Sequence, residues 1–156
     1  MILDAQNRFS ASQAVTAAAV GTNVIDLGVN RSIGNGEPMA VAFFVEVAAK
    51  VSATNEDYTF QVEYSTDAGQ TTGRQVVGTR IFETTPTAPA QDAALLTVGF
   101  TVIVPIPPTK LAESGRYLGI RYVTAGTSPA VTVSSFLVPQ KDIDATNDYN
   151  NNYTIA

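Results

Sequence analysis

The sequence predicts an all-β fold, a jelly-roll β-sandwich of about eight antiparallel strands with extended N- and C-terminal arms. Apolar and polar residues alternate with a period of two along several segments, as in strands that bury one face. Loops containing Gly and Pro separate these segments, and no segment has a convincing helical period. An up-and-down barrel is the alternative. An immunoglobulin-type sandwich is disfavoured because the chain has no Cys and no Trp.

The clearest strand is DYTFQVEYST (57–66), in which every second residue is apolar and is expected to face the core. Those residues are Tyr58, Phe60, Val62 and Tyr64.

The segment EPMAVAFFVEVA (37–48) is apolar on both faces, so we expect its second face to be partly covered as well. One face carries Met39, Val41, Phe43, Val45 and Val47, and the other carries Ala40, Ala42, Phe44, Glu46 and Ala48.

The segment ALLTVGFTVIV (94–104) is expected to be a strand with five apolar residues on one side. These are Leu96, Val98, Phe100, Val102 and Val104. Weaker strands are expected at 15–20, 23–29 and 75–83, and one short helical turn at 109–113.

Residues 116–124 and 130–138 are predicted to form two strands joined by a turn at AGTSP. Alternate residues of the two strands should face one another in the core: Leu118, Ile120 and Tyr122 against Val131, Val133 and Leu137. Gly119 and Arg121 fall on the opposite face, where a neighbouring subunit could approach.

Three regions follow from this pattern: an N-terminal arm (1–14), the sandwich domain (15–138) and a C-terminal tail (139–156). The arms carry apolar residues without a local core, and we expect one or both arms to lie on a partner protein. Two further aromatic residues fall on the less apolar sides of their strands, where together they would form an association patch. The predicted partner-binding residues are Ile2, Leu3, Phe9, Phe44, Phe136, Tyr149 and Tyr153.

The composition argues against several classes of partner. Charged residues make up 15% of the chain, the net charge is −5, and the nine basic residues are scattered singly. Nucleic-acid binding needs clustered Lys and Arg, so we expect no nucleic-acid partner. No apolar run approaches the roughly 20 residues of a membrane span, and the N-terminus does not have the pattern of a secretory signal.

Catalytic and metal-binding patterns are weak. The chain has no His and no Cys, which removes the commonest general base and the commonest metal ligands. No lysine is spaced for a Ser–Lys site, and the carboxylates fall mostly in loops or at outward positions, which disfavours a paired-carboxylate enzyme. The string DIDATNDYNNNY from Asp142 has the alternating oxygens of a calcium loop but lacks its glycine and its final glutamate. We therefore expect an interaction protein with no catalytic residue, cofactor or metal.

The N-terminal string MILDAQNRFSASQAVTAAAVGTNVIDLG resembles the opening of the capsid cement proteins of tailed bacteriophages, of the type described for a Bordetella phage. RYLGIRYVTAGT (116–127) also resembles a late strand of that family, and Ala11 departs from the acidic residue expected after Ser10. The shared positions are Met1 to Asp4, Asn7, Phe9, Ser10, Gln13, Ala14, Thr16 and Val24 to Gly28.

The resemblance implies a structural virion protein on the outer surface of the capsid, made in the bacterial host cytoplasm. It would bind the major capsid protein at junctions between subunits and would associate with itself, as a dimer in preference to a trimer. The rival hypothesis is a glycan-binding jelly-roll module of a phage tail or secreted assembly. That rival predicts exposed aromatic residues beside the loops at one end of the sandwich.

Overall fold

The computed structural model describes residues 5–31, 33, 36–51, 55–86, 89–107 and 115–143. The strands expected at 57–66 and 75–83 are found there almost residue for residue, and a helical turn at 140–143 follows the last strand. The short turn expected at 109–113 lies outside the described residues. The elements are η1 (Ala5–Asn7), β1 (Arg8–Val15), β2 (Ala19–Val20), β3 (Ile25–Arg31), β4 (Met39–Val47), β5 (Asp57–Ser65), β6 (Gln75–Glu83), β7 (Gln91–Asp92), η3 (Ala93–Leu95), β8 (Thr101–Ile106), β9 (Gly115–Ala125) and β10 (Val131–Pro139).

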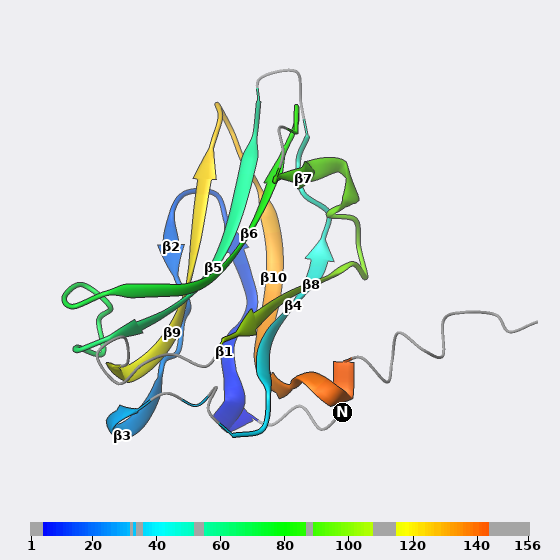
Figure 1. The fold of residues 1–156 in the computed structure, drawn as a ribbon. Coiled ribbons are helices and arrows are strands. Elements are labelled where there is room, and N and C mark those ends of the chain that lie inside the picture. The colour runs from blue at the N-terminus through cyan, green and yellow to red at the C-terminus, as the bar shows by residue number, and fades with distance from the viewer. Residues whose placement is uncertain are drawn as a thin grey trace, which may run out of the picture.

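The strands form two sheets packed face to face, a β-sandwich, which confirms the predicted all-β class (Figure 1). Sheet A has the order β1-β10-β4-β8. Sheet B has the order β2-β9-β5-β6-β7, and β3 also pairs with β9. All pairs are antiparallel except β6 with β7. The jelly-roll topology is compatible with this order and stays our interpretation of it.

The alternating residues of β5 lie in the core, as predicted. Tyr58, Phe60, Val62 and Tyr64 are all at most 1% exposed. Phe60 is the centre of an aromatic cluster, with ring centroids 5.2 to 5.9 Å from those of Phe43, Phe82 and Tyr122. Tilted and edge-to-face contacts of this kind add to the stabilisation from burial.

A polar network is buried beside this cluster and joins the two sheets. The Tyr122 hydroxyl of β9 forms a hydrogen bond of 2.8 Å with Ser10 Oγ of β1, which lies 2.6 Å from Ser135 Oγ of β10. Burial raises the pKa of Tyr122. A core that contains three hydroxyl groups is stable only because each one has a partner.

The last two strands face one another as predicted but do not form a hairpin. Leu118, Ile120 and Tyr122 of β9 are buried against the same core as Val131 and Val133 of β10. However, β9 belongs to sheet B and β10 to sheet A, so the turn at 126–130 crosses between the sheets. The periodicity shows which side chains point inward, and that pattern is the same for a hairpin and for a pair of strands that face across a core.

The prediction of a strand at 94–104 is confirmed only in its second part, from Thr101 onwards. Regular pairing with β4 begins at Thr101, after the 3-10 turn η3. The Asp92 carboxylate accepts a hydrogen bond from Ala94 N and caps this turn, and Gly99 has a φ of +85°, which favours glycine. Consequently Val98, expected on the same side of a strand as Leu96 and Phe100, lies on a turn and is 69% exposed.

The N-terminal boundary also needs correction. Residues 8–14, assigned from the sequence to an arm, belong to β1, which pairs with β10 at the edge of sheet A. Phe9 is fully buried in the core of the sandwich. Its backbone oxygen accepts hydrogen bonds from Asn23 N and Thr22 Oγ1, which hold β1 beside the chain entering β3. The sandwich therefore begins at Arg8.

Candidate contact surface

The outer face of sheet A carries a row of directly paired residues that crosses all four strands. The register places Arg8 of β1 opposite Phe136 of β10, Phe136 opposite Ala42 of β4, and Ala42 opposite Ile103 of β8. Directly opposed residues in antiparallel strands point to the same face of the sheet. Three apolar side chains and one guanidinium group thus follow one another across the sheet.

The two aromatic residues predicted to form an association patch are neighbours in the structure. The ring centroids of Phe44 and Phe136 are 5.9 Å apart with an interplanar angle of 67°, and both side chains are half-buried. With Ile103 they pack on a second apolar cluster that is separate from the main core. We call Phe44, Phe136 and Ile103 the aromatic patch.

One end of the same face is covered by the chain itself. Ala40, Ala42 and Val138 are almost fully buried, and Ile143 from the helical turn packs with them. Figure 1 shows this turn crossing the lower ends of β4 and β10. The sequence predicted a partly covered second face for β4, and this cover accounts for it.

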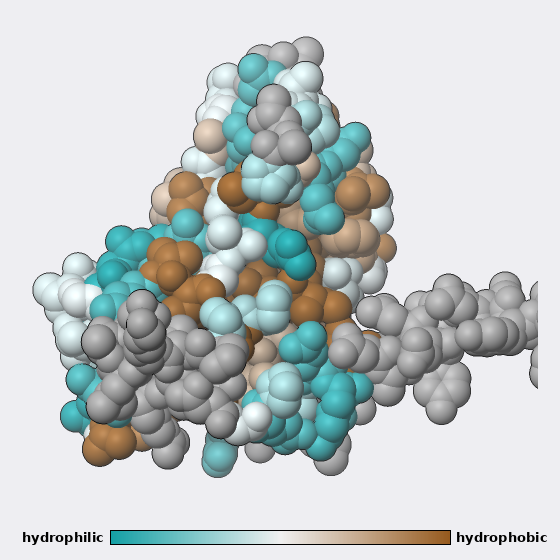
Figure 2. Space-filling model, in the orientation of Figure 1, coloured by the Kyte–Doolittle hydropathy of each residue, from teal (hydrophilic) through white to brown (hydrophobic). Residues whose placement is uncertain are grey.

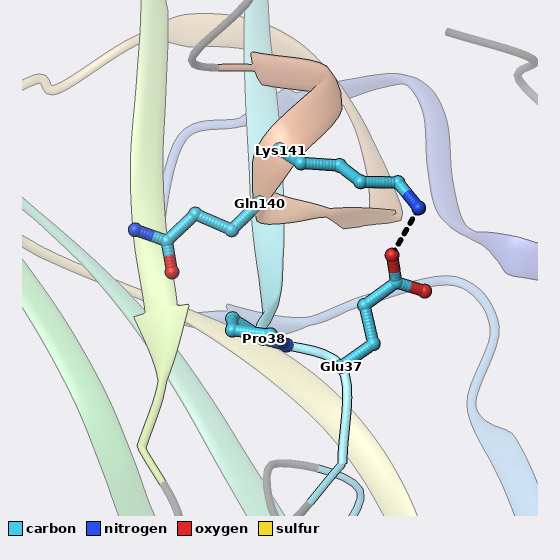
Figure 3. A pocket seen from close by; sticks show the side chains of 4 residues that line it. All are labelled: Glu37, Pro38, Gln140 and Lys141. Atoms are coloured by element: carbon cyan, nitrogen blue, oxygen red, sulfur yellow. Dashed lines mark ion pairs between the residues drawn. The ribbon is translucent and has the colours of Figure 1, made fainter.

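The helical turn is fastened at its first residues. Gln140 N donates to Pro38 O at 2.9 Å, and Lys141 forms an exposed ion pair with Glu37, which raises the pKa of Lys141 (Figure 3). These residues line an open hollow of about 290 Å³. The two contacts fix the direction in which the chain leaves β10.

The polar groups bordering the aromatic patch differ in how well they are satisfied. The Glu46 carboxylate accepts hydrogen bonds from Ser12 and Ser134, which lower the pKa of Glu46. Arg8, at the other side of the patch, has a buried Nε atom without a hydrogen-bond partner in the part of the chain that the structure describes. The carboxylate is thus occupied within the chain, whereas the guanidinium group keeps an unused donor.

A second apolar surface lies at the end of the sandwich and was not found from the sequence. The chain at 96–100 continues beside 45–49 through hydrogen bonds from Gly99 N to Val45 O and from Ala49 N to Leu96 O, each 2.8 Å long. This places Val98 beside Val47, which is 57% exposed, and next to Leu95, which is 47% exposed. Figure 2 shows hydrophobic residues gathered over η3 and the turn after it. We call these three residues the apolar corner.

Sequence periodicity placed Val47 on the same face as Val45, and Val98 on the same side as Leu96, but the structure separates both pairs. A β-bulge in the pairing of β4 with β10 sets Val47 opposite Thr132, whose neighbours Val131 and Val133 point into the core. Val98 lies on a turn and not on a strand, so strict alternation does not apply to either residue.

The outer face of sheet B is covered at Gly119 and Arg121, contrary to the expectation that a neighbouring subunit could approach there. The loop 66–74 folds over β9, and the amide of Gln70 lies 3.2 Å from both Gly119 N and Ile120 O. Arg121 Nη2 donates to Gln70 O at 2.9 Å. A neighbouring subunit would meet this loop rather than the strand.

A buried carboxylate holds this loop in place. Glu63 of β5 is fully buried and accepts hydrogen bonds from Arg74 Nη2 at 2.8 Å and from Arg121 Nη2 at 3.1 Å. Within the loop, the Asp67 carboxylate accepts hydrogen bonds from the backbone and hydroxyl groups of Thr71 and Thr72, which hold the pKa of Asp67 well below its usual range.

Of the seven residues predicted to bind a partner, the structure brings together Phe44 and Phe136 and places Phe9 in the core. Phe9 is therefore unavailable to a partner, and its assignment is corrected. The other four, Ile2, Leu3, Tyr149 and Tyr153, lie outside the described residues, as does most of the calcium-like string.

No group of three or more His, Cys, Asp or Glu within the described ranges is placed to hold a metal ion. Over the same residues, no helix has the length and apolar character needed to span a bilayer. A second open hollow, of about 230 Å³, lies between β6 and β8 and is lined by Arg80, Gln91 and apolar or hydroxyl side chains.

The fold and the surface together define a β-sandwich protein whose most distinctive described feature is an aromatic contact face bordered by an arginine. Comparison of the sequence with known protein families shows that residues 9–137 match the Bbp16 family, so the chain belongs to this family of Bordetella phage proteins. The match spans the sandwich from β1 to β10. No curated protein matches the chain.

Proposed function

We propose that this phage protein is a structural virion protein, a cement or decoration protein that binds the outer surface of the capsid. In this role it stabilises junctions between major capsid protein subunits. Membership of a phage family supports a virion role. The observation that carries the proposal is the aromatic patch, because paired aromatic side chains that remain partly exposed on the outer face of a sheet are typical of a protein contact.

A cement protein has to touch more than one subunit, and the apolar corner supplies a second surface for this purpose. Once the first contact has formed, the second closes at a high effective concentration, so each contact can be weak alone. A contact of ordinary size buries roughly 800 Å² on each partner. Self-association as a dimer belongs to the same proposal and would multiply the number of simultaneous contacts.

We further propose that the protein is not an enzyme. The whole chain lacks His and Cys, and no catalytic residue or cofactor is part of the proposed role. Glu63, a fully buried carboxylate, is engaged by two arginines that hold a loop, which is a structural use of charge.

The test of this function is retention on capsids. The double variant Phe44→Ser, Phe136→Ser should bind empty shells of the phage that encodes the chain roughly thirtyfold more weakly or worse, because it removes the centre of the contact. Val123→Ser is the matched control, since it removes an exposed apolar side chain from sheet B. Co-sedimentation with shells measures both, and equal retention of all three proteins would contradict the proposal.

The glycan-binding alternative gains no support from the aromatic patch, whose residues lie in mid-strand rather than beside the loops at one end of the sandwich. A glycan array run beside the co-sedimentation assay separates the two functions. Binding to glycans that is lost in the Phe44→Ser, Phe136→Ser variant, without any binding to shells, would favour the alternative.

The residues of the two arms that we expect to bind a partner, Ile2, Leu3, Tyr149 and Tyr153, all lie outside the described ranges. Because β1 starts at Arg8, a test of the N-terminal arm has to remove residues 2–4 and leave the strand intact. Removal of 144–156 tests Tyr149 and Tyr153 in the same way. If neither truncation changes retention or heat resistance of the shells, the arms have no part in binding.

A further inference from the structure

We propose that the outer face of sheet A binds a segment of the capsid subunit that places an apolar side chain on the aromatic patch and a carboxylate on Arg8. This inference rests on the proposed function and adds the chemistry of the partner.

The first step concerns the position of Arg8. It lies on the edge strand β1, directly opposite Phe136, so its side chain begins on the same face as the patch. The row Arg8, Phe136, Ala42, Ile103 therefore has a cationic end at β1 and an apolar end at β8. Aromatic residues together with arginine are the composition of the energetically dominant part of protein interfaces.

The second step concerns the unused donor. Arg8 Nε is buried without a hydrogen-bond partner within the described residues. A buried donor that lacks an acceptor destabilises the protein, and the penalty is larger for a charged group. The other arginines with described side-chain contacts bind acceptors through Nε: Arg74 and Arg121 to Glu63, Arg116 to Asp26, and Arg80 to Ile103 O. Arg8 differs from them in having none.

Two acidic residues described near this face are already engaged within the chain. Glu46 is the acidic residue on the outer face of β4, and its carboxylate is engaged by Ser12 and Ser134. The acidic Glu37 is paired with Lys141 at the helical turn. We infer that a bound partner supplies an acceptor for the Arg8 guanidinium group, and a carboxylate matches this group in charge and in geometry.

The test measures the affinity of purified protein for empty shells assembled from the major capsid protein of the same phage. Arg8→Gln should raise the dissociation constant roughly tenfold to a hundredfold, the range expected for a hydrogen bond to a charged group. Arg8→Lys should restore only part of the affinity, because lysine keeps the charge but not the planar fork of donors. Added salt should weaken binding of the native protein more than binding of Arg8→Gln.

The matched control is Arg116→Gln, which makes the same change of charge on an exposed arginine of sheet B. It should bind shells as the native protein does. Thermal unfolding of each variant confirms that the sandwich is intact.

Three results would overturn the inference while leaving the proposed function in place. Arg8→Gln could bind as tightly as the native protein, or it could lose no more affinity than Arg116→Gln does. Alternatively, Arg8→Gln could lose self-association in light scattering and keep its affinity for shells, in which case a second copy occupies the face. Failure of the native protein to bind shells would instead contradict the proposed function itself.

Discussion

Gly115 shows how a single residue is fixed by the approach of two strands. A Cβ atom at this position would lie 2.5 Å from Ser65 O and 2.8 Å from Ser65 N. Those atoms belong to the backbone of β5, which pairs with β9 along its whole length and cannot move aside cheaply. The position therefore requires glycine for space, and not for an unusual backbone angle.

Gly115→Ala should lower the free energy of unfolding by about 1–3 kcal/mol, the usual cost of forcing extra atoms into a packed site. Gly36→Ala is the control, because a Cβ atom there meets no other atom within 4 Å. Urea unfolding of the two variants measures the difference. Equal stabilities would show that β9 does not approach Ser65 as closely as described.

Glu63 is a fully buried carboxylate whose charge is neutralised by two arginines. Glu63→Gln should destabilise the protein by about 3 kcal/mol, the low end for breaking a buried ion pair, because Arg74 and Arg121 are partly exposed and can reach water. Asp26→Asn, in the exposed pair with Arg116, should have a much smaller effect. Chemical denaturation of both variants provides the comparison, and a ranking in the reverse order would refute this assignment.

At the scale of elements, the strands that alternate over their full length could be predicted from the sequence. The predicted ends of β5 and β6 agree with the structure to within one residue. The apolar residues on both faces of β4 indicated that both faces are covered. The patterns failed where contacts distant in sequence decide the structure. Phe9 belongs to a strand because β10 lies beside it, and no local pattern records the position of β10.

The same limit explains the candidate site. Phe44 and Phe136 could be placed on outward faces by parity, but the pairing of β4 with β10 that brings them together is a property of the fold. A binding role for Arg8 could not be predicted from the sequence, because an isolated arginine near a terminus forms no recognisable pattern. The role that we propose for it depends on the strand register that sets it opposite Phe136 and on the absence of an acceptor for its Nε among the described residues.

The loop 66–74 provides a prediction on pH. Because the pKa of Asp67 lies well below the ordinary value of 3.8, its carboxylate contributes stability that is fully present above 3.8 and is lost progressively as the pH falls from there through the lower pKa of the folded protein. Asp67→Asn should therefore be less stable than the native protein at pH near 6, and the gap should be smaller at pH near 3. Denaturant titrations at the two pH values measure this gap. A gap that stays constant would mean that the charge of Asp67 does not hold the loop.

At the scale of the whole molecule, the two outer faces of the sandwich differ in how the chain covers them. Part of the outer face of sheet B is covered by a loop that Glu63, Arg121 and Gln70 hold in place. The outer face of sheet A is covered at one end by the helical turn and keeps the aromatic patch partly exposed, with Arg8 on the edge strand beside it. A protein bound to a shell needs such a difference, because one face has to meet the shell while another faces outward.

The central claim is that sheet A is the face that meets the capsid. A cryo-electron microscopy map of the protein bound to shells tests this claim most directly, at a resolution that separates the two sheets. We expect Phe44, Phe136 and Arg8 to lie against a capsid subunit and the loop 66–74 to point away from the shell. A map in which the outer face of sheet A is open to solvent and sheet B contacts the shell would contradict it.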